Sequence, residues 1–286
     1  MSRACVYILN QNPIYRGMFS VSVRMLRKHN PSIPIILLYI QDAGLDNYKL
    51  PSNLAKHIGR DAAKKYMMIE EQEIFDLCKN LHIELRCLPS PCHLLNRYSS
   101  AHRVYLKEIQ EESVLLLDTD TFIFENIDSL FDKQSDFVAD RMRGYFVSTK
   151  DKPPHTEQTS WLVTFKNGLE NIKVKMSPFN SGVVVFHKGK AALYGEQVGD
   201  YCNQLLLKKH PFADVMYAHR EDARNREECA CTLFVLENKL TWEYFDKSEV
   251  QTHTSEFPTK IFHSTSPAWP YYFDMFGNQG LLMENG

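Results

Sequence analysis

Two uninterrupted apolar runs constrain the fold more than any other feature of this sequence. Residues 35–40 read IILLYI and residues 114–117 read VLLL. Both are far shorter than the roughly 18 apolar residues that a membrane-spanning helix needs. A strand that is apolar at every position is typical of a parallel sheet covered on both faces. The two runs therefore predict a layered α/β domain.

The neighbouring segments alternate as such a domain requires. A strand over residues 4–9, an amphipathic helix over 15–29 and the strand over 35–40 form a β-α-β unit. Further helices are predicted over residues 61–80, 99–109, 190–209 and 226–237. Further strands are predicted over residues 82–88, 136–139, 161–165, 183–187 and 260–263. The polar residues 141–159 predict an exposed excursion, and the second half alternates less regularly than the first.

Charge and cysteine usage narrow the class of protein. The chain of 286 residues has 33 Lys and Arg against 35 Asp and Glu. A protein that binds nucleic acid by neutralising phosphates is normally basic, so this balance argues against one. Seven irregularly spaced cysteines without a C-x-x-C pair predict free thiols in a reducing compartment, hence a cytoplasmic protein. The N-terminal residues lack the pattern of a signal peptide.

The second apolar run continues directly into Asp118, Thr119 and Asp120. Side chains two residues apart in an extended segment point the same way, so the two carboxylates face one point in space. Their repulsion is relieved by a divalent cation, and ligands of open α/β sheets bind beyond the carboxyl ends of strands. A solvated turn or a helix cap is the alternative. The apolar residues 122–124 that follow favour a buried site.

Residues 114–131, VLLLDTDTFIFENIDSLF, resemble the D-x-D segment of glycosyltransferase family 8, the glycogenin-like and bacterial lipopolysaccharide galactosyltransferase-like enzymes. Three further segments resemble this family in the same order: residues 7–25, PFNSGVVVF at 178–186, and IFH at 261–263 with Trp269 beyond. The resemblance implies a single Rossmann-like GT-A domain with a mixed central sheet flanked by helices. It implies that residues 1–125 bind the nucleotide sugar and that residues 126–286 bind the acceptor.

The resemblance also implies a metal site. Asp118, Asp120 and His263 match the family's ligands for a manganese ion that bridges the donor's diphosphate. Two carboxylates and one imidazole suit Mn²⁺ or Mg²⁺, and the imidazole favours Mn²⁺. The alternative for His263 is an ordinary buried histidine of a strand.

Further residues match the family's donor contacts. Asn12 and Tyr15 match its uridine pocket, and Arg103 matches a basic residue that contacts the phosphate or the sugar. Thr119, between the two aspartates, is placed with the donor-binding residues. The alternatives are that Tyr15 simply begins a helix and that Arg103 is a solvated helix residue.

The second half supplies the residues matched to the sugar and the reaction. Asp140 and Asn180 match residues that contact the donor sugar, and Ser181 and Gly182 complete the F-N-[SA]-G turn, where glycine lets the backbone approach closely. Glu227 and Glu228 stand where the family has an acidic pair that opens a helix. A carboxylate pair in a first helical turn also complements the helix dipole, which is the alternative.

The last motif departs from the family's pattern. The family has a glycine and a lysine between the histidine and the tryptophan, whereas HSTSPAW at residues 263–269 has neither. The candidates to replace the missing positive charge are Lys260, Arg103 and the hydroxyl groups of residues 264–266, with Ser266 placed among the donor-binding residues. The aromatic segment beyond, residues 269–273, either packs on the core, which we favour, or stacks on a sugar or a peptide.

The expected function is metal-dependent transfer of a sugar from a nucleotide sugar, a UDP-sugar, to a hydroxyl group, with retention. The acceptor is a glycan, a protein or a small molecule, and whether copies of the chain form a homo-oligomer is left open. One alternative is a GT-A-like domain that binds a sugar or a protein without turnover. Another is a sugar nucleotidyltransferase, which is disfavoured because NQNP at residues 10–13 lacks the glycines and basic residues of its phosphate loop. Hydrolase motifs such as G-x-S-x-G and H-E-x-x-H are absent.

Overall fold

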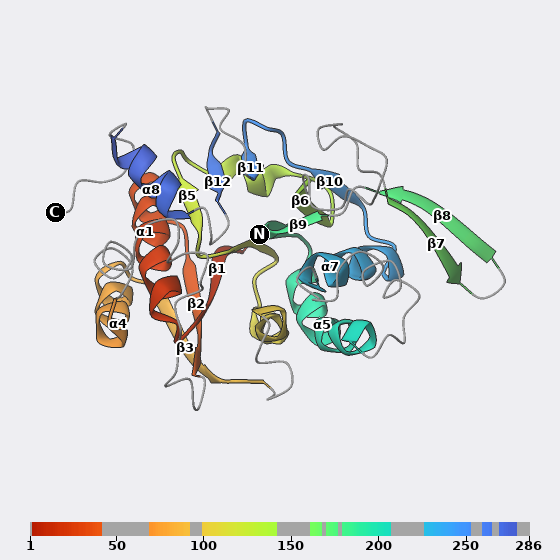
Figure 1. The fold of residues 1–286 in the computed structure, drawn as a ribbon, viewed down its shortest axis with the longest axis horizontal. Coiled ribbons are helices and arrows are strands. Elements are labelled where there is room, and N and C mark those ends of the chain that lie inside the picture. The colour runs from red at the N-terminus through yellow and green to blue at the C-terminus, as the bar shows by residue number, and fades with distance from the viewer. Residues whose placement is uncertain are drawn as a thin grey trace.

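A computed structural model describes residues 2–41, 69–91, 99–141, 161–167, 170–176, 179–206, 226–252, 259–264 and 269–278. Its centre is a seven-stranded sheet with the order β10-β6-β9-β4-β1-β2-β3 (Figure 1). The strands are β1 (Arg3–Asn10), β2 (Ile35–Gln41), β3 (Glu84–Pro89), β4 (Ser113–Leu117), β6 (Phe137–Arg141), β9 (Phe179–Phe186) and β10 (Trp242–Tyr244). Strands β1 to β4 are mutually parallel, while β9 is antiparallel to both β4 and β6. The predicted mixed α/β sheet is confirmed.

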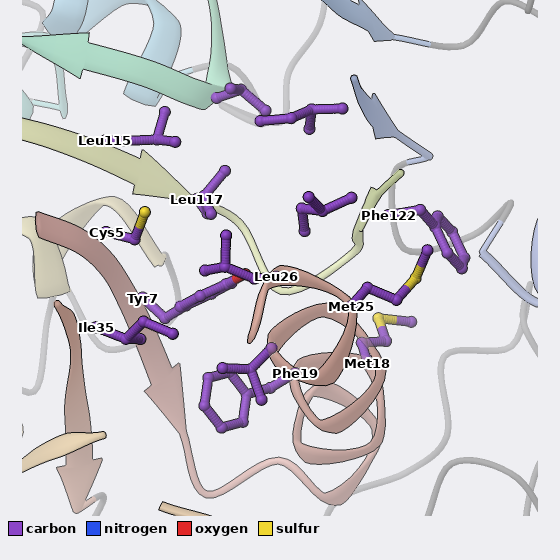
Figure 2. Packing of buried hydrophobic residues seen from close by; sticks show 14 of the residues in the cluster. Cys5, Tyr7, Met18, Phe19, Met25, Leu26, Ile35, Leu115, Leu117 and Phe122 are labelled. Atoms are coloured by element: carbon purple, nitrogen blue, oxygen red, sulfur yellow. The ribbon is translucent and has the colours of Figure 1, made fainter. Parts of the chain in front are cut away.

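Both faces of this sheet are buried, as the apolar runs predict. Leu115 and Leu117 belong to one hydrophobic cluster and Leu116, between them, to the other, because side chains alternate along a strand. The first cluster is covered by α1 (Pro13–His29), α4 (Glu71–Asn80) and α8 (Trp269–Asn278). The second is covered by the 3₁₀ helix η1 (Ser99–Glu108) and by α5 (Lys190–Leu206) and α7 (Arg226–Glu237). Figure 2 shows α1 packed over β1 and β4.

Two smaller sheets accompany the central one. Strands β11 (Val250–Thr252), β12 (Ile261–His263) and β5 (Thr121–Ile123) form a three-stranded sheet. Strands β7 (Trp161–Asn167) and β8 (Glu170–Met176) form an antiparallel pair that extends away from the central sheet in Figure 1. A short 3₁₀ helix, η2 (Asp128–Asp132), follows β5. Among the described residues, no helix combines the length and the apolar character needed to cross a membrane.

The first helix begins two residues before its predicted start at residue 15, and its N-terminus shows why. Asn12 accepts a hydrogen bond from the backbone N–H of Ile14 (2.9 Å), and Pro13 occupies the first helical turn. A capping asparagine followed by proline is a favoured helix start.

Other elements differ from the prediction. The predicted helix over 99–109 is instead a 3₁₀ helix. Strands β8, β10 and β11 were not predicted, and the predicted segments 61–68, 142–159 and 207–209 lie outside the described residues.

The aromatic segment near the C-terminus forms α8 and packs on the core, as favoured. Trp269 and Phe276 are fully buried, and the ring of Trp269 stacks on Phe122 with 5.6 Å between centroids. Tyr271 alone among the large side chains described in α8 is strongly exposed, at 66%. This helix therefore closes the first hydrophobic cluster over β5.

Candidate functional site

Three chain segments meet at the carboxyl end of β4. Asp118 follows this strand directly, and its backbone N–H donates a hydrogen bond to the carbonyl oxygen of Gly182 in β9 (2.7 Å). Because β9 runs antiparallel to β4, its first residues lie at the same edge of the sheet as the last residues of β4. Thr121 in β5 pairs with His263 in β12, which brings the C-terminal strand to the same place.

Asp118, Asp120 and His263 form one cluster at this edge. The His263 Nε2 atom lies 3.1 Å from Asp120 Oδ1 and 3.8 Å from Asp118 Oδ2. One ligand atom from each residue lies within 4.8 Å of the others. The Asp120 and His263 side chains are only 8% and 5% exposed, whereas Asp118 is 38% exposed. The solvated-turn alternative is therefore wrong for Asp120, and the cluster opens outward at Asp118.

Asn180 fixes which nitrogen of His263 faces the carboxylates. Its Oδ1 atom accepts a hydrogen bond from the backbone N–H of Gly182 (2.9 Å) and lies 3.0 Å from His263 Nδ1. An amide oxygen only accepts, so His263 Nδ1 must carry the proton in this contact. The Nε2 atom is therefore the one available as a ligand, and a histidine ligand held in this way is typical of metal sites.

Gly182 makes room for the imidazole ring. A Cβ atom built on Gly182 would lie 2.0 Å from Cε1 of His263 and 2.5 Å from both ring nitrogens. The ring thus occupies the space that any other residue would fill. The group that lies against this glycine in the structure is His263.

The three ligands fit a small divalent cation. Neighbouring ligands of an octahedral ion with bonds of about 2.1 Å lie roughly 3 Å apart. The contact of 3.1 Å between His263 and Asp120 matches this spacing, and the contact of 3.8 Å to Asp118 is slightly longer. Carboxylate oxygens with one imidazole are a donor set for Mn²⁺ or Mg²⁺. The residues present therefore fit the ion that the resemblance implies.

Without a cation, a proton on His263 balances the carboxylates. Burial alone would lower the pKa of His263, but the negative charges of Asp120, Asp118 and Asp140 outweigh it. Together they raise the pKa to about 9. A protonated imidazole beside Asp120 offsets the negative charge of this buried carboxylate. A bound cation would replace that proton.

The stability of the metal-free protein is expected to fall as the pH rises. The pKa of His263 is about 9 when folded and about 6.5 when unfolded, so the folded state holds the extra proton between these values. This contribution is complete below about pH 6.5 and is lost as the pH rises through about 9. Urea unfolding in EDTA at pH 6 and pH 9, with His263→Gln as reference, measures it. A pH-independent difference between the two proteins would contradict the assignment.

Arg103 and Asp140 flank the cluster. Arg103 is buried, so the alternative of a solvated helix arginine is wrong. Its Nη2 atom donates to the carbonyl oxygen of Ser181 (2.9 Å) and to Asp118 Oδ1 (3.3 Å). Asp140 is also buried and lies opposite Asn180 in the pairing of β6 with β9, beside an irregularity of the register. Such a bulge re-aims a side chain next to a site.

A pocket opens next to Asp118 at the carboxyl ends of β1 and β4. Its lining residues are Ile8, Asn10, Tyr15, His102, Arg103, Leu116, Leu117, Asp118, Thr119 and Asp120. Tyr15, Arg103 and Thr119, which were predicted to bind the donor, line this pocket. Asn12 caps α1 instead of lining this pocket. Asn10 and His102 also line the pocket but were not predicted. Asn10 lies two residues before the predicted Asn12, and His102 directly precedes the predicted Arg103.

The remaining predicted residues are placed only in part. Glu228 lies half-buried in the first turn of α7, whereas the side chain of Glu227 and all of Ser266 lie outside the described residues. Lys260 donates to Ser129 Oγ (2.8 Å). The hydroxyl group of Ser264 is buried and donates to the carbonyl oxygen of Asp120 (3.0 Å). Ser264 thus holds the D-x-D turn.

Comparison with known proteins identifies the fold of this chain through solved structures. No protein-family model and no curated protein matches the sequence. Among solved structures, the galactosyltransferase LgtC in complex with donor and acceptor sugar analogues is similar over 98% of this chain and 97% of its own, with a TM-score of 0.55 and 12% identity. This chain has the fold of LgtC. The LgtC fold is the GT-A fold that the sequence resemblance implies, and the prediction is confirmed at that level.

Two further structures are similar. An active-site mutant of LgtC covers the same shares of both chains, with a TM-score of 0.52 and 12% identity. The glycosyltransferase GlyE of Streptococcus pneumoniae TIGR4 is 13% identical, with a TM-score of 0.49 over 99% of this chain and 66% of that one. In the LgtC fold of this chain, the cluster of Asp118, Asp120 and His263 lies at the carboxyl edge of the central sheet.

Proposed function

We propose that this chain is a glycosyltransferase that transfers a sugar from a UDP-sugar to an acceptor hydroxyl group with the aid of Mn²⁺ or Mg²⁺. The observation that carries the proposal is the cluster of two aspartates and one histidine beside a pocket at the carboxyl edge of the sheet. The LgtC fold supports it, since LgtC is a galactosyltransferase whose structure holds donor and acceptor sugar analogues.

The side chains of the cluster divide into ligands and supports. Asp118, Asp120 and His263 would hold the cation, which supplies Lewis-acid stabilisation of a leaving diphosphate. Asn180 holds the His263 ring with Nε2 toward the carboxylates, and Arg103 holds one oxygen of Asp118. With these supports in place, little reorganisation is needed when charge develops.

The pocket walls would bind the donor. Tyr15 offers a ring on which a base stacks, and Asn10, His102 and Thr119 offer polar groups around it. Stacking of a base on an aromatic side chain is worth about 1–3 kcal/mol. Asp140 and Asn180 lie on the other side of Asp118, toward β6 and β9, where the donor sugar would lie. In this proposal residues 1–125 form the nucleotide-sugar-binding half and residues 126–286 the acceptor-binding half, whose Asp140 and Asn180 also reach the donor sugar. Glu227 and Glu228 stay predicted to act in the reaction.

The proposal includes retention of the anomeric configuration and a cytoplasmic location. Retention follows the resemblance to family 8, and nuclear magnetic resonance of the first product formed measures it. The cytoplasmic location rests on cysteine usage: the described residues include the free thiols of Cys5, Cys78, Cys87, Cys202 and Cys231. Thiols persist in a reducing compartment.

A donor screen tests the activity. The purified chain, incubated with a set of UDP-sugars and Mn²⁺, is expected to release UDP from one of them by hydrolysis or transfer. Excess EDTA should stop the release and added Mn²⁺ should restore it, with Mg²⁺ less effective. Undiminished turnover in metal-free buffer would contradict the proposed metal-dependent mechanism. Tight UDP binding without turnover of any donor would favour a binding domain instead.

A further inference from the structure

A chain of three buried hydroxyl groups ends at the metal-binding turn. Tyr7 Oη lies 2.8 Å from Ser22 Oγ, and Ser22 Oγ lies 2.8 Å from Thr121 Oγ1. Thr121 Oγ1 in turn donates to the backbone carbonyl oxygen of Asp118 (2.9 Å). All three side chains are fully buried. The chain therefore links β1, α1 and β5 to the first residue of the D-x-D turn.

The direction of these hydrogen bonds is fixed by chemistry. A carbonyl oxygen only accepts, so the Thr121 proton is committed to Asp118. Ser22 must then donate to Thr121, because the contact between them needs a proton that Thr121 has already used. Tyr7 must donate to Ser22 for the same reason. Burial raises the pKa of Tyr7 far above its usual value, so the phenol keeps the proton that it donates.

These hydroxyl groups lie in an apolar environment. Figure 2 shows Tyr7 reaching from β1 toward α1 among the side chains of the first hydrophobic cluster, including Leu26 and Leu117. A buried hydroxyl group costs free energy unless it is hydrogen-bonded. A phenylalanine, an alanine and a valine would fill these positions without that requirement. The hydroxyl groups therefore call for a role beyond packing.

The turn that they reach is restrained at the backbone carbonyl oxygens of both of its aspartates. Thr121 holds the carbonyl oxygen of Asp118, and Ser264 holds that of Asp120 through both its backbone N–H (3.1 Å) and its hydroxyl group (3.0 Å). The direction of each carboxylate depends on the peptide planes of this turn. Without the Thr121 hydrogen bond, the peptide plane between Asp118 and Thr119 loses the restraint on its carbonyl oxygen, next to the partly exposed carboxylate of Asp118.

We propose that Thr121 is a positioning residue of the metal site, and that Ser22 acts through it by orienting its hydroxyl group, while Tyr7 only supplies the hydrogen bond that Ser22 accepts. The proposal rests on the proposed metal-dependent function. It gives Thr121 no contact with the cation or with the donor. Its effect is to hold Asp118 Oδ2 on the side that faces His263 Nε2.

Substitution of Thr121 tests the proposal through Mn²⁺ affinity, measured by the electron paramagnetic resonance signal of free Mn²⁺. Thr121→Val keeps the shape and removes the donor, and we expect its Kd to rise roughly tenfold, as for outer partners of other metal sites. Thr121→Ser keeps the hydroxyl group and should stay within about twofold of the original chain. Thr121→Val with unchanged Mn²⁺ affinity, or Thr121→Ser as weak as Thr121→Val, would overturn the proposal.

Tyr7→Phe and Ser22→Ala separate positioning from general stability. Both disturb the same buried chain and should lower the urea midpoint of the metal-free protein. Tyr7→Phe leaves the bonds from Ser22 to Thr121 and from Thr121 to Asp118 intact, so its Mn²⁺ affinity should not change. Ser22→Ala removes the group that orients Thr121 and should raise the Kd, by less than Thr121→Val. Equal Kd values for Tyr7→Phe and Ser22→Ala count against the proposal even if Thr121→Val fails to fold.

The same titrations separate this proposal from the proposed function. If the unmodified chain binds no Mn²⁺, the metal-dependent function fails. If the unmodified chain binds Mn²⁺ and Thr121→Val binds it equally well, the function stands and the positioning role of Thr121 fails.

Discussion

Replacing Asp120 by asparagine is expected to abolish saturable Mn²⁺ binding and to lower kcat/KM by about a thousandfold or more. Asp120 is the buried carboxylate of the cluster, and its Oδ1 atom lies 3.1 Å from His263 Nε2. Asparagine keeps the shape but removes the negative charge, so the site loses an anionic ligand and one of its two carboxylate charges. Lewis-acid stabilisation is worth several kcal/mol, and about 1.4 kcal/mol corresponds to a factor of ten in rate.

The exposed Asp132 of η2 is the matched control. Asp132→Asn makes the same chemical change away from the cluster and should leave both Mn²⁺ affinity and turnover unaltered. Isothermal titration calorimetry with Mn²⁺ and steady-state release of UDP supply the two measurements. Turnover by Asp120→Asn that stays within a factor of ten, with the same response to EDTA, would remove Asp120 from the metal site.

Gly182→Ala is expected to be nearly as damaging, through a steric effect. The added methyl group would stand 2.0 Å from His263 Cε1, so the imidazole ring must leave its place. Both the hydrogen bond to Asn180 and the contact with Asp120 depend on that place. We expect Mn²⁺ affinity to fall by about a hundredfold, the upper range for a disturbed partner of a ligand. Overpacking should also cost about 1–3 kcal/mol of stability.

Gly199 provides the control for this substitution. It lies within α5, and a Cβ atom there would meet only Val104 Cγ1 at 3.4 Å, an ordinary contact. Gly199→Ala should therefore preserve Mn²⁺ affinity and slightly raise the urea midpoint, because alanine is favoured over glycine inside a helix by about 0.5–1 kcal/mol. If Gly182→Ala bound Mn²⁺ as well as Gly199→Ala does, the position of the His263 ring against Gly182 would not be needed for metal binding.

The parts of the fold that the sequence predicts best are those with continuous burial. Residues 35–40 and 114–117 are apolar at every position and lie in β2 and β4. A strand that is covered on both faces needs apolar side chains on both, so its sequence shows an uninterrupted apolar run. The helix over Arg226–Glu237 has the predicted bounds. The three-residue strands β10 and β11 are too short for any period to show. Helix α8 was missed as a helix because its run of aromatic residues is apolar on several sides.

The candidate site divides in the same way. Asp118 and Asp120 follow from their position at the end of an apolar strand, which is a local signal. His263 follows only from the resemblance, since 143 residues separate it from Asp120. Neither the apolar strand nor the resemblance predicts the hydrogen bonds that hold the ligands in place. Asn180 contacts His263 across 83 residues, and the hydroxyl groups of Ser22 and Thr121 meet across 99. Such pairs depend on which strands become neighbours, and spacing along the chain does not specify that.

The separation between Asp120 and His263 has a consequence for the whole molecule. A cation held by both residues would act as a cross-link between the middle of the chain and its C-terminal strand, closing a loop of 143 residues. A ligand that binds only the folded state stabilises that state in proportion to the logarithm of its concentration. Under the proposed function, the metal supply of the cell would therefore set the lifetime of this protein as well as its rate of turnover.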